Sequence, residues 1–224
     1  LRLMKKTFFI SADHGLAVVY FLQSDVVTTL LDAGVEVVLL TDDALIERIR
    51  ERCGRPGLIV EGLRLKDSQA YFQSESTSMQ WWLDFLRRAG ASKRINLEAV
   101  ESYIAQVEAE AHSRRKALFP LMKLVVWLLR RSAWARRLLG RLQMRFSPDL
   151  YSDLFDRYEP DLVVASTPGW RWDRYLLRQA AAHGVPTASV IVGWDNSSSY
   201  SLPGAAVDWI TCWSQLQKEE LMLG

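Results

Sequence analysis

The chain has 224 residues, and 49% of them are hydrophobic, which is enough for one large domain or for one and a half small ones. Its 28 basic and 26 acidic residues give a net charge of +2, so any electrostatic function depends on where the charges lie. Cys53 and Cys212 have neither a disulfide pattern nor metal-type spacing, and Cys212 stands in an apolar run typical of a core strand. We expect a globular protein without a disulfide framework or a zinc site.

Targeting signals are weak in this sequence. The apolar run 8–10 is too short for a signal peptide, and the run 118–129 is too short for a membrane span and contains Pro120 and Lys123. We therefore expect a cytoplasmic protein. The chain opens on Leu1 and stops within a predicted helix that starts at residue 215, which is compatible with a fragment.

The first third of the chain alternates strands with helices. Gly34 and Gly54 stand where helix C-caps are expected, and Asp42 stands where an N-cap is expected. The predicted strands are 5–11, 35–40 and 58–65, the predicted helices are 16–33 and 44–53, and residues 66–78 are predicted to be a loop.

The alternation stops in the middle of the chain and resumes near its end. Residues 79–142 favour helix almost throughout, with breaks predicted at 90–92 and at Pro120. The later elements are predicted helices at 147–158 and 171–183 and predicted strands at 162–166, 187–192 and 209–213. Strands that alternate with helices imply a parallel sheet with right-handed crossovers.

The predicted fold class is therefore α/β: a Rossmann-like parallel sheet of about six strands, with helices on both faces and a helical insertion. In this division, residues 1–78 and 148–224 are two parts of one Rossmann-like domain. Residues 79–147 are the helical, basic and amphipathic insertion between them.

Polar residues follow the predicted strand 187–192. Gly193 is followed by a tryptophan, a carboxylate, an amide and a hydroxyl, namely Trp194, Asp195, Asn196 and Ser197. Ligands bind outside the carboxyl ends of strands in open α/β sheets, so these four residues are candidates for binding a hydroxyl-rich molecule. The alternative is a surface loop in which Asp195 and Asn196 form Asx-turns.

A second candidate follows the first strand, where Asp13 and His14 precede a single glycine, Gly15. An imidazole can take a proton from an alcohol, and a neighbouring carboxylate can orient it, so His14 and Asp13 are the candidate catalytic residues. The alternative is a loop histidine without a catalytic task. The three-glycine dinucleotide fingerprint, the Walker lysine motif and short histidine–carboxylate spacings are absent from the sequence, so we expect no cofactor and no metal in this chain.

Charge is unevenly distributed, because residues 111–148 contain ten basic residues and no acidic one. On one continuous helical wheel a basic face lies opposite a leucine-rich face, with tryptophans near the boundary. This pattern predicts a helix in an anionic membrane interface, with Lys123, Trp127, Arg130, Trp134, Arg137 and Arg141 as the membrane-binding residues. The alternatives are a leucine face packed on the sheet and, least favoured, nucleic-acid binding, since the aromatic residues are not interleaved on a stacking face.

Three segments together resemble bacterial surface-polysaccharide and glycerophosphate transferases. They are Ala165-Ser166-Thr167-Pro168, Ile191-Val192-Gly193-Trp194-Asp195-Asn196, and the run from Asp208 to Glu220. In that group a strand ending in a Trp-Asp-Asn turn precedes a proline, an Asp-initiated strand and a Gln-Lys-Glu helix. This chain departs from the pattern after Ser197, because no Lys-Gly pair follows.

The resemblance is to the amino-terminal half of a two-domain GT-B glycosyltransferase. It implies an acceptor-side domain, with Thr167 and Trp170 joining the Trp194 loop as substrate-binding residues and a nucleotide-activated donor held by a carboxyl-terminal domain absent here. It also implies a sugar or polyol acceptor, which in such pathways is commonly lipid-linked, and a location on the inner face of the cell membrane. The alternative function is a non-catalytic Rossmann-like adaptor or ligand-binding module at a membrane surface, because fold alone does not separate the two.

Overall fold

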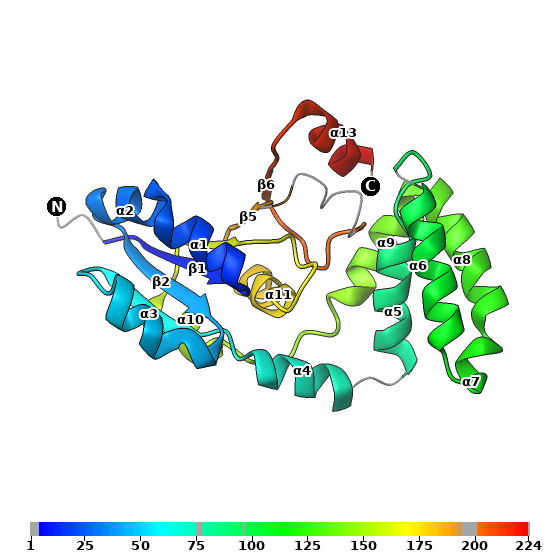
Figure 1. The fold of residues 1–224 in the computed structure, drawn as a ribbon, viewed down its shortest axis with the longest axis horizontal. Coiled ribbons are helices and arrows are strands. Elements are labelled where there is room, and N and C mark those ends of the chain that lie inside the picture. The colour runs from blue at the N-terminus through cyan, green and yellow to red at the C-terminus, as the bar shows by residue number, and fades with distance from the viewer. Residues whose placement is uncertain (1–4, 75–77, 96, 192, 194–200, 224) are drawn as a thin grey trace. The chain divides into compact units, whose positions relative to one another are not determined.

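The computed structural model describes residues 5–74, 78–95, 97–191, 193 and 201–223, and it divides the chain into two compact units. The sheet unit comprises Leu1–Ser74, Ser147–Val192 and Ala205–Thr211. The helical unit comprises Glu75–Phe146, Gly193–Gly204 and Cys212–Gly224. Figure 1 labels most of the elements of both units.

The sheet unit is built on a six-stranded parallel sheet with the strand order β3-β2-β1-β4-β5-β6. The strands are β1 (Thr7–Ala12), β2 (Glu36–Thr41), β3 (Leu58–Gly62), β4 (Leu162–Ala165), β5 (Thr187–Val190) and β6 (Trp209–Thr211). The predicted α/β class with a Rossmann-like parallel sheet is confirmed.

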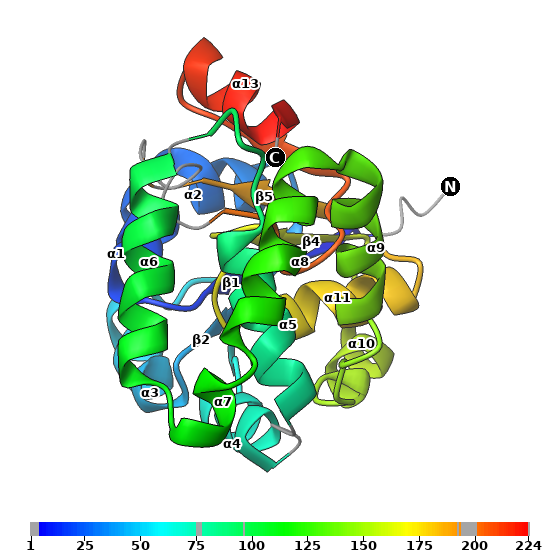
Figure 2. The same cartoon turned by 90° about the vertical axis from the view of Figure 1, so that its right-hand side faces the viewer.

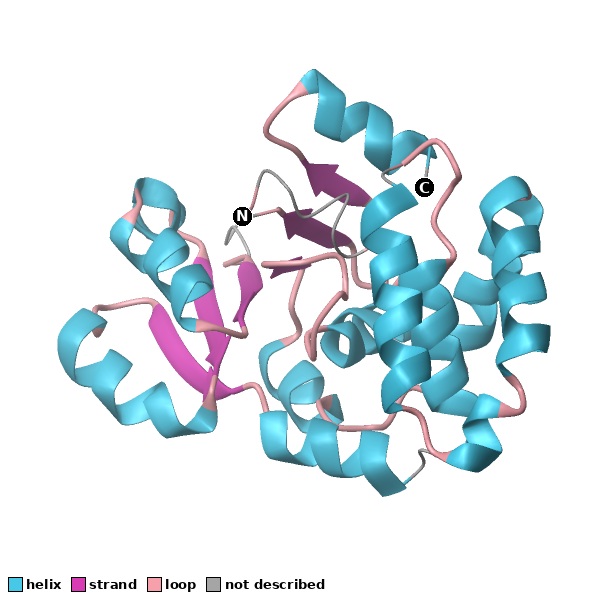
Figure 3. Cartoon of the chain, turned by 45° about the vertical axis from the view of Figure 1, so that its right-hand side comes forward, coloured by secondary structure: helices cyan, strands magenta, loops and turns pink. Residues whose placement is uncertain are grey.

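Helices cover both faces of this sheet, as Figure 3 shows for the magenta strands. One face packs against α1 (Gly15–Gln23), α2 (Asp25–Asp32) and α3 (Ile46–Cys53), and the other packs against α4 (Leu65–Ser74), α10 (Ser152–Tyr158) and α11 (Arg174–Ala182). Successive strand residues point to opposite faces, so Phe9 packs with Phe155 while Ile10 packs with Phe21. Double coverage explains why β1 is apolar almost throughout.

The helix predicted at 16–33 is two helices, and this corrects the sequence interpretation. Ser24 leaves the helical conformation, with φ −89° and ψ 175°, and its hydroxyl accepts a hydrogen bond from the amide of Val26 at the start of α2. Among the described residues no single helix is long and apolar enough to cross a bilayer; α1 and α2 reach that length and apolarity only together, with a bend of 47°. Ala17, Phe21 and Val27 of this pair are buried in the core.

The loop predicted at 66–78 is also wrong over most of its length, since α4 occupies Leu65–Ser74. Aromatic contacts explain the helix better than its polar composition does. The ring of Tyr71 meets Tyr175 edge to face at 5.5 Å, and the ring of Phe72 meets Trp172 at 5.7 Å. Packing of α4 against the rest of the sheet unit has therefore outweighed a local sequence preference for loop.

All the regular secondary structure that is described in the helical unit is helical. The helices are α5 (Ser78–Ala89), α6 (Leu97–Glu110), α7 (Ser113–Lys116), α8 (Phe119–Arg131), α9 (Ala133–Gln143) and α13 (Gln215–Leu223). Figure 2 shows α5, α6, α8 and α9 side by side. In the core of this unit the rings of Trp82, Phe85 and Phe119 contact one another edge to face. The break predicted at 90–92 is confirmed, and helix is also interrupted at 117–118, just before Pro120. Pro120 lies in the first turn of α8, where a missing amide hydrogen costs no helical bond.

The end of the sheet differs from the sequence interpretation in one further respect. β6 stops at Thr211, so Cys212 follows the strand and is exposed rather than a core residue. The carboxylate of Asp208 anchors β6 by accepting hydrogen bonds from the amide and the hydroxyl of Thr187, at 2.8 and 3.0 Å.

Tyr151 ties three elements of the sheet unit together. Its side chain is fully buried, and its hydroxyl donates to the carbonyl of Leu63, just after β3, at 2.7 Å. Its amide donates to the side-chain oxygen of Gln179 in α11 at 2.9 Å. Tyr151, which directly precedes α10, therefore holds both the end of the edge strand β3 and the helix α11 in place.

We expect Tyr151→Phe to lower the free energy of unfolding by about 1–3 kcal/mol, because the carbonyl of Leu63 loses a buried donor while the ring volume is kept. Urea denaturation measures this loss. Tyr20→Phe is the matched control, since Tyr20 is 38% exposed and its substitution is expected to change stability by less than about 0.5 kcal/mol. Equal stabilities of the two variants would show that the Tyr151 hydroxyl does not stabilise the fold.

Candidate functional site

The strand order reverses between β1 and β4, and this point defines the candidate site. From β1 the chain moves outward through β2 to β3, and it then returns to β4 on the other side of β1. In open α/β sheets neighbouring loops leave such a reversal in opposite directions, and ligands bind in the crevice outside the carboxyl ends of the two strands. We refer to this place in the chain as the crevice. The residues at this crevice are Asp13 and His14 after β1 and Ser166–Trp170 after β4.

Asp13 is the central charge of the crevice. Its carboxylate is buried and accepts three hydrogen bonds: from the Ser166 hydroxyl at 3.0 Å, from Arg171 Nε at 2.7 Å and from His14 Nδ1 at 2.5 Å. Burial raises the pKa of Asp13, but the hydrogen bond from His14 and the charge of Arg171 outweigh burial, and the net pKa lies below its usual value. Asp13 is therefore ionised at neutral pH.

His14 is oriented by this carboxylate. It precedes α1 in an extended conformation, with φ −154° and ψ 161°, and its side chain is 24% exposed. An ionised Asp13 can only accept, so Nδ1 of the neutral ring carries the proton and Nε2 is the accepting nitrogen. The two candidate catalytic residues thus have the geometry of a histidine base with a carboxylate that sets its tautomer.

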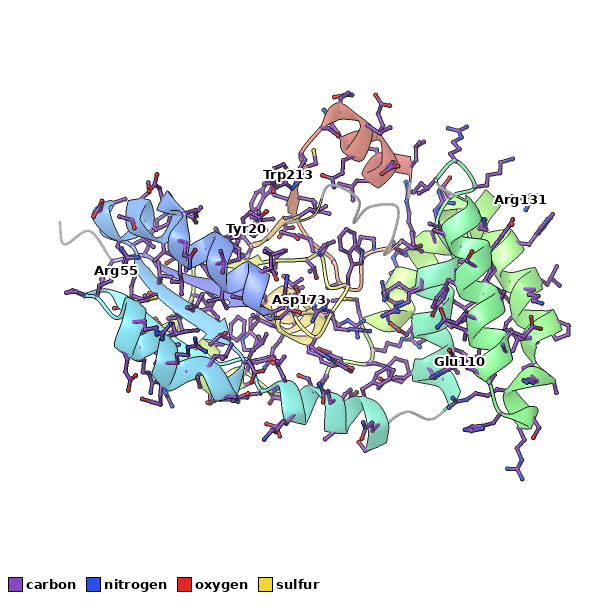
Figure 4. The ribbon with its side chains drawn as sticks, in the orientation of Figure 1. Tyr20, Arg55, Glu110, Arg131, Asp173 and Trp213 are labelled. Carbon is purple, nitrogen blue, oxygen red and sulfur yellow. The ribbon has the colours of Figure 1, made fainter. Side chains whose placement is uncertain are left out.

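A second carboxyl group, that of Asp173, lies fully buried at the start of α11 (Figure 4). It accepts hydrogen bonds from the amide of Thr167 at 3.1 Å and from the Thr167 hydroxyl at 2.9 and 2.8 Å. Burial, with the charge of Asp13 as the next cause, raises the pKa of Asp173 to about 8. Asp173 is therefore protonated at neutral pH, whereas Asp13 is ionised.

Thr167 and Trp170, both predicted to bind substrate, shape the turn between β4 and α11. The Trp170 amide donates to the Thr167 hydroxyl at 3.0 Å, and Gly169 between them takes a positive φ of 77°. Both side chains are buried, with exposed fractions of 3% for Thr167 and 1% for Trp170. The structure therefore gives them a clear supporting role, which is to hold the loop that carries Ser166 and Arg171.

Four of the predicted substrate-binding residues, Trp194, Asp195, Asn196 and Ser197, lie outside the described residues. The strand before them, β5, runs parallel to β1 in the same sheet, so both strands end at the same edge. The structure thus confirms that the strands before the two candidate loops are parallel and end at the same edge of one sheet.

The predicted membrane-binding residues belong to α8 and α9, and the structure separates them into three groups. Trp127, Trp134, Arg137 and Arg141 are exposed. Lys123 is also exposed but forms an ion pair with Glu108 of α6 at 2.7 Å. Arg130 is buried, with an exposed fraction of 8%, and burial lowers its pKa.

The burial of Arg130 corrects the helical wheel on which the basic face was predicted. That wheel assumed one continuous helix, but Ser132 leaves the helical conformation, with φ −119° and ψ 110°, and caps the start of α9. Residues of α8 and α9 therefore cannot be placed on one wheel. Because Arg130 is buried, it does not share an exposed face with Arg137.

Metal chemistry finds no support in the part of the chain that the structure describes, where no group of three or more His, Cys, Asp or Glu side chains could hold an ion. No family model, curated protein or solved structure matches the chain. The resemblance to GT-B transferases stays a prediction, and the geometry of the crevice is what bears on function.

Sequence reasoning missed Arg171 and Asp173, which were assigned to a helix expected at 171–183. That helix begins at Arg174, so the two residues belong to the loop. Ser166 was noted only as part of a motif, although its hydroxyl bonds Asp13. The signal that could have identified all three is their position directly after a parallel strand next to β1.

The raised pKa of Asp173 gives a test of the crevice. Between about pH 4 and pH 8 this carboxyl is protonated in the folded protein and ionised in the unfolded chain. Its contribution to the free energy of unfolding is therefore complete below about pH 4. That contribution is lost as the pH rises to about 8. Asparagine does not titrate. We therefore expect Asp173→Asn to gain stability relative to the wild type as the pH rises through this window, by an amount on the order of a few kcal/mol.

Urea denaturation at about pH 5 and about pH 8 measures this difference. The matched control is Asp156→Asn, which removes an exposed carboxylate from α10 of the same unit. A stability difference between wild type and Asp173→Asn that stays constant with pH would contradict the assignment of a protonated Asp173.

Proposed function

We propose that the crevice between β1 and β4 binds a hydroxyl group of a sugar or polyol acceptor, and that the chain is the acceptor-side domain of a glycosyltransferase-like enzyme. The observation that carries the proposal is the Asp13–His14 pair, whose Nδ1–Oδ1 distance is 2.5 Å, placed at the reversal of strand order. A hydrogen-bonded pair of this kind needs no such position if it serves only to stabilise the fold. Ligand sites in open α/β sheets are found there.

The proposed reaction uses Nε2 of His14 as general base. It takes the proton of the acceptor hydroxyl while the hydroxyl oxygen bonds to the anomeric carbon of a nucleotide-activated sugar, and the nucleoside diphosphate leaves with the electron pair of the broken bond. For a glycerophosphate donor the oxygen attacks phosphorus instead, and a nucleoside monophosphate leaves. Asp13 stabilises the resulting imidazolium through its bond to Nδ1.

The surroundings of the pair fit a hydroxyl-bearing molecule that is joined to an apolar carrier. Arg171, whose side chain is 42% exposed, bonds Asp13 and adds positive charge to the crevice. The helix that begins after His14 turns an apolar strip outward, formed by Leu16, Val19 and Tyr20 with exposed fractions of 54%, 42% and 38%. Polar groups at the helix start and apolar groups along it would suit the two ends of a lipid-linked acceptor.

The proposal is tested by the release of nucleotide from a panel of activated donors, including UDP-hexoses and CDP-glycerol, with a bacterial membrane extract as the source of acceptor. The complete polypeptide that contains residues 1–224 is used. We expect His14→Ala to lower turnover by about a hundredfold or more, the low end of general-base contributions. His112→Ala is the matched control, because His112 is an exposed residue before α7 and is expected to keep wild-type turnover.

Two results would overturn the assignment. A loss of turnover below about threefold in His14→Ala would remove His14 from the proton-transfer step, since general bases contribute much more. No nucleotide release from any donor, together with calorimetric binding of the extracted acceptor to the wild type, would instead support the non-catalytic ligand-binding module.

A further inference from the structure

The helical unit carries an apolar surface that its own core does not cover. On one side of α8, Phe119, Val126 and Leu129 are buried in the core of the unit. On the other side large apolar residues are exposed, and two more are exposed on α9. This α8–α9 strip consists of Leu121 (54% exposed), Leu124 (60%), Trp127 (51%), Leu128 (50%), Trp134 (71%) and Leu138 (40%).

The strip follows the helical repeat and is not a scatter of single residues. Leu121, Leu124 and Leu128 are spaced three and four residues apart, which places them on one face of α8. Isolated exposed leucines are ordinary on protein surfaces, but a contiguous row of large apolar side chains marks a surface that another body covers.

Positive charge borders the strip. Residues 111–148 contain no aspartate or glutamate, and Arg131, Arg137 and Arg141 are exposed on the same two helices. The Arg131 guanidinium lies 4.3 Å from the centre of the Trp127 ring and donates to the Trp127 carbonyl at 3.3 Å. Arg131, labelled in Figure 4, is exposed at the end of α8. A cation held beside an exposed indole suits the boundary between lipid headgroups and acyl chains.

We propose that the α8–α9 strip docks this protein on an anionic lipid bilayer, with the leucine and tryptophan side chains in the interface and the arginines on the headgroups. An anionic bilayer supplies both an apolar layer and negative charge, which together match the strip. A second copy of the chain fits less well, because a two-fold contact would bring the same arginines face to face. The inference does not depend on the proposed transfer reaction, since docking needs neither donor nor acceptor.

The outward face of α1 provides the internal comparison. Leu16, Val19 and Tyr20 are also exposed there, but residues 7–47 contain no lysine or arginine. Apolar exposure without basic residues lacks the electrostatic part of binding to anionic lipid. We therefore assign docking to α8 and α9 and not to α1.

Co-sedimentation with vesicles tests the proposal, using phosphatidylglycerol and phosphatidylcholine in equal parts and phosphatidylcholine alone. We expect wild-type binding to the anionic vesicles that weakens with salt. Arg137→Glu combined with Arg141→Glu is expected to weaken binding by about tenfold or more, because each basic residue near the surface contributes to attraction. Leu124→Ser combined with Leu128→Ser is expected to weaken it by a similar factor, since both side chains lose apolar burial.

Each pair has a matched control. Arg48→Glu with Arg52→Glu changes the net charge equally on α3, and Leu216→Ser with Met222→Ser removes exposed apolar residues, 68% and 78% exposed, from α13 of the helical unit. Both controls are expected to bind as the wild type does. Circular dichroism verifies that each variant keeps its helices, and the exposed arginine pair remains informative if the leucine pair unfolds.

Three results would overturn the proposal. One is no binding of the wild type to anionic vesicles. Another is an equal loss in the α3 charge control, which would show attraction without a docking face. The third is a wild-type dimer in sedimentation velocity that becomes monomeric in the leucine pair, which would make the strip an interface between copies of the chain.

Discussion

The buried carboxylate of Asp13 is the constraint on which the candidate site depends. A charge removed from water is tolerated only when partners replace the lost hydration, and here His14, Ser166 and Arg171 do so from both sides of the strand reversal. The ion pair with Arg171 and the bond from Ser166 connect the loop after β1 to the loop after β4. The same carboxylate that fixes the imidazole therefore holds the crevice in one shape.

Burial, and after it the charge of Asp13, explains the raised pKa of Asp173. Two carboxyl groups near each other inside a protein do not both ionise readily, and each is moved by its own neighbours. Asp13 faces a guanidinium and an imidazole, whereas Asp173 is fully buried and bonded to Thr167, so their pKa values move in opposite directions. The two neighbouring carboxyl groups therefore hold opposite protonation states at neutral pH, Asp13 ionised and Asp173 protonated.

The helical unit shows how one backbone break changes the meaning of a sequence pattern. On a continuous wheel Arg130 and Arg137 share a face, but the chain leaves the helical conformation at Ser132 between them, and Arg130 is buried whereas Arg137 is exposed. The leucines of α8 likewise divide between core and surface, with Leu129 inside and Leu128 outside. Local composition marks the segment as amphipathic and basic, and the packing of α5, α6 and α9 around α8 decides which side chains remain exposed.

The sequence by itself determined the α/β class, the parallel sheet and the placement of Asp13 and His14 at a strand end, because apolar strand runs, glycine caps and the spacing of helices are local properties. It did not determine that α4 is a helix or that α1 and α2 are separate, since aromatic packing and a serine cap outweigh local preference there. Only the tertiary structure decided the partners of Asp13. Ser166 and Arg171 lie more than 150 positions away along the chain, and the pairing of β1 with β4 brings them together.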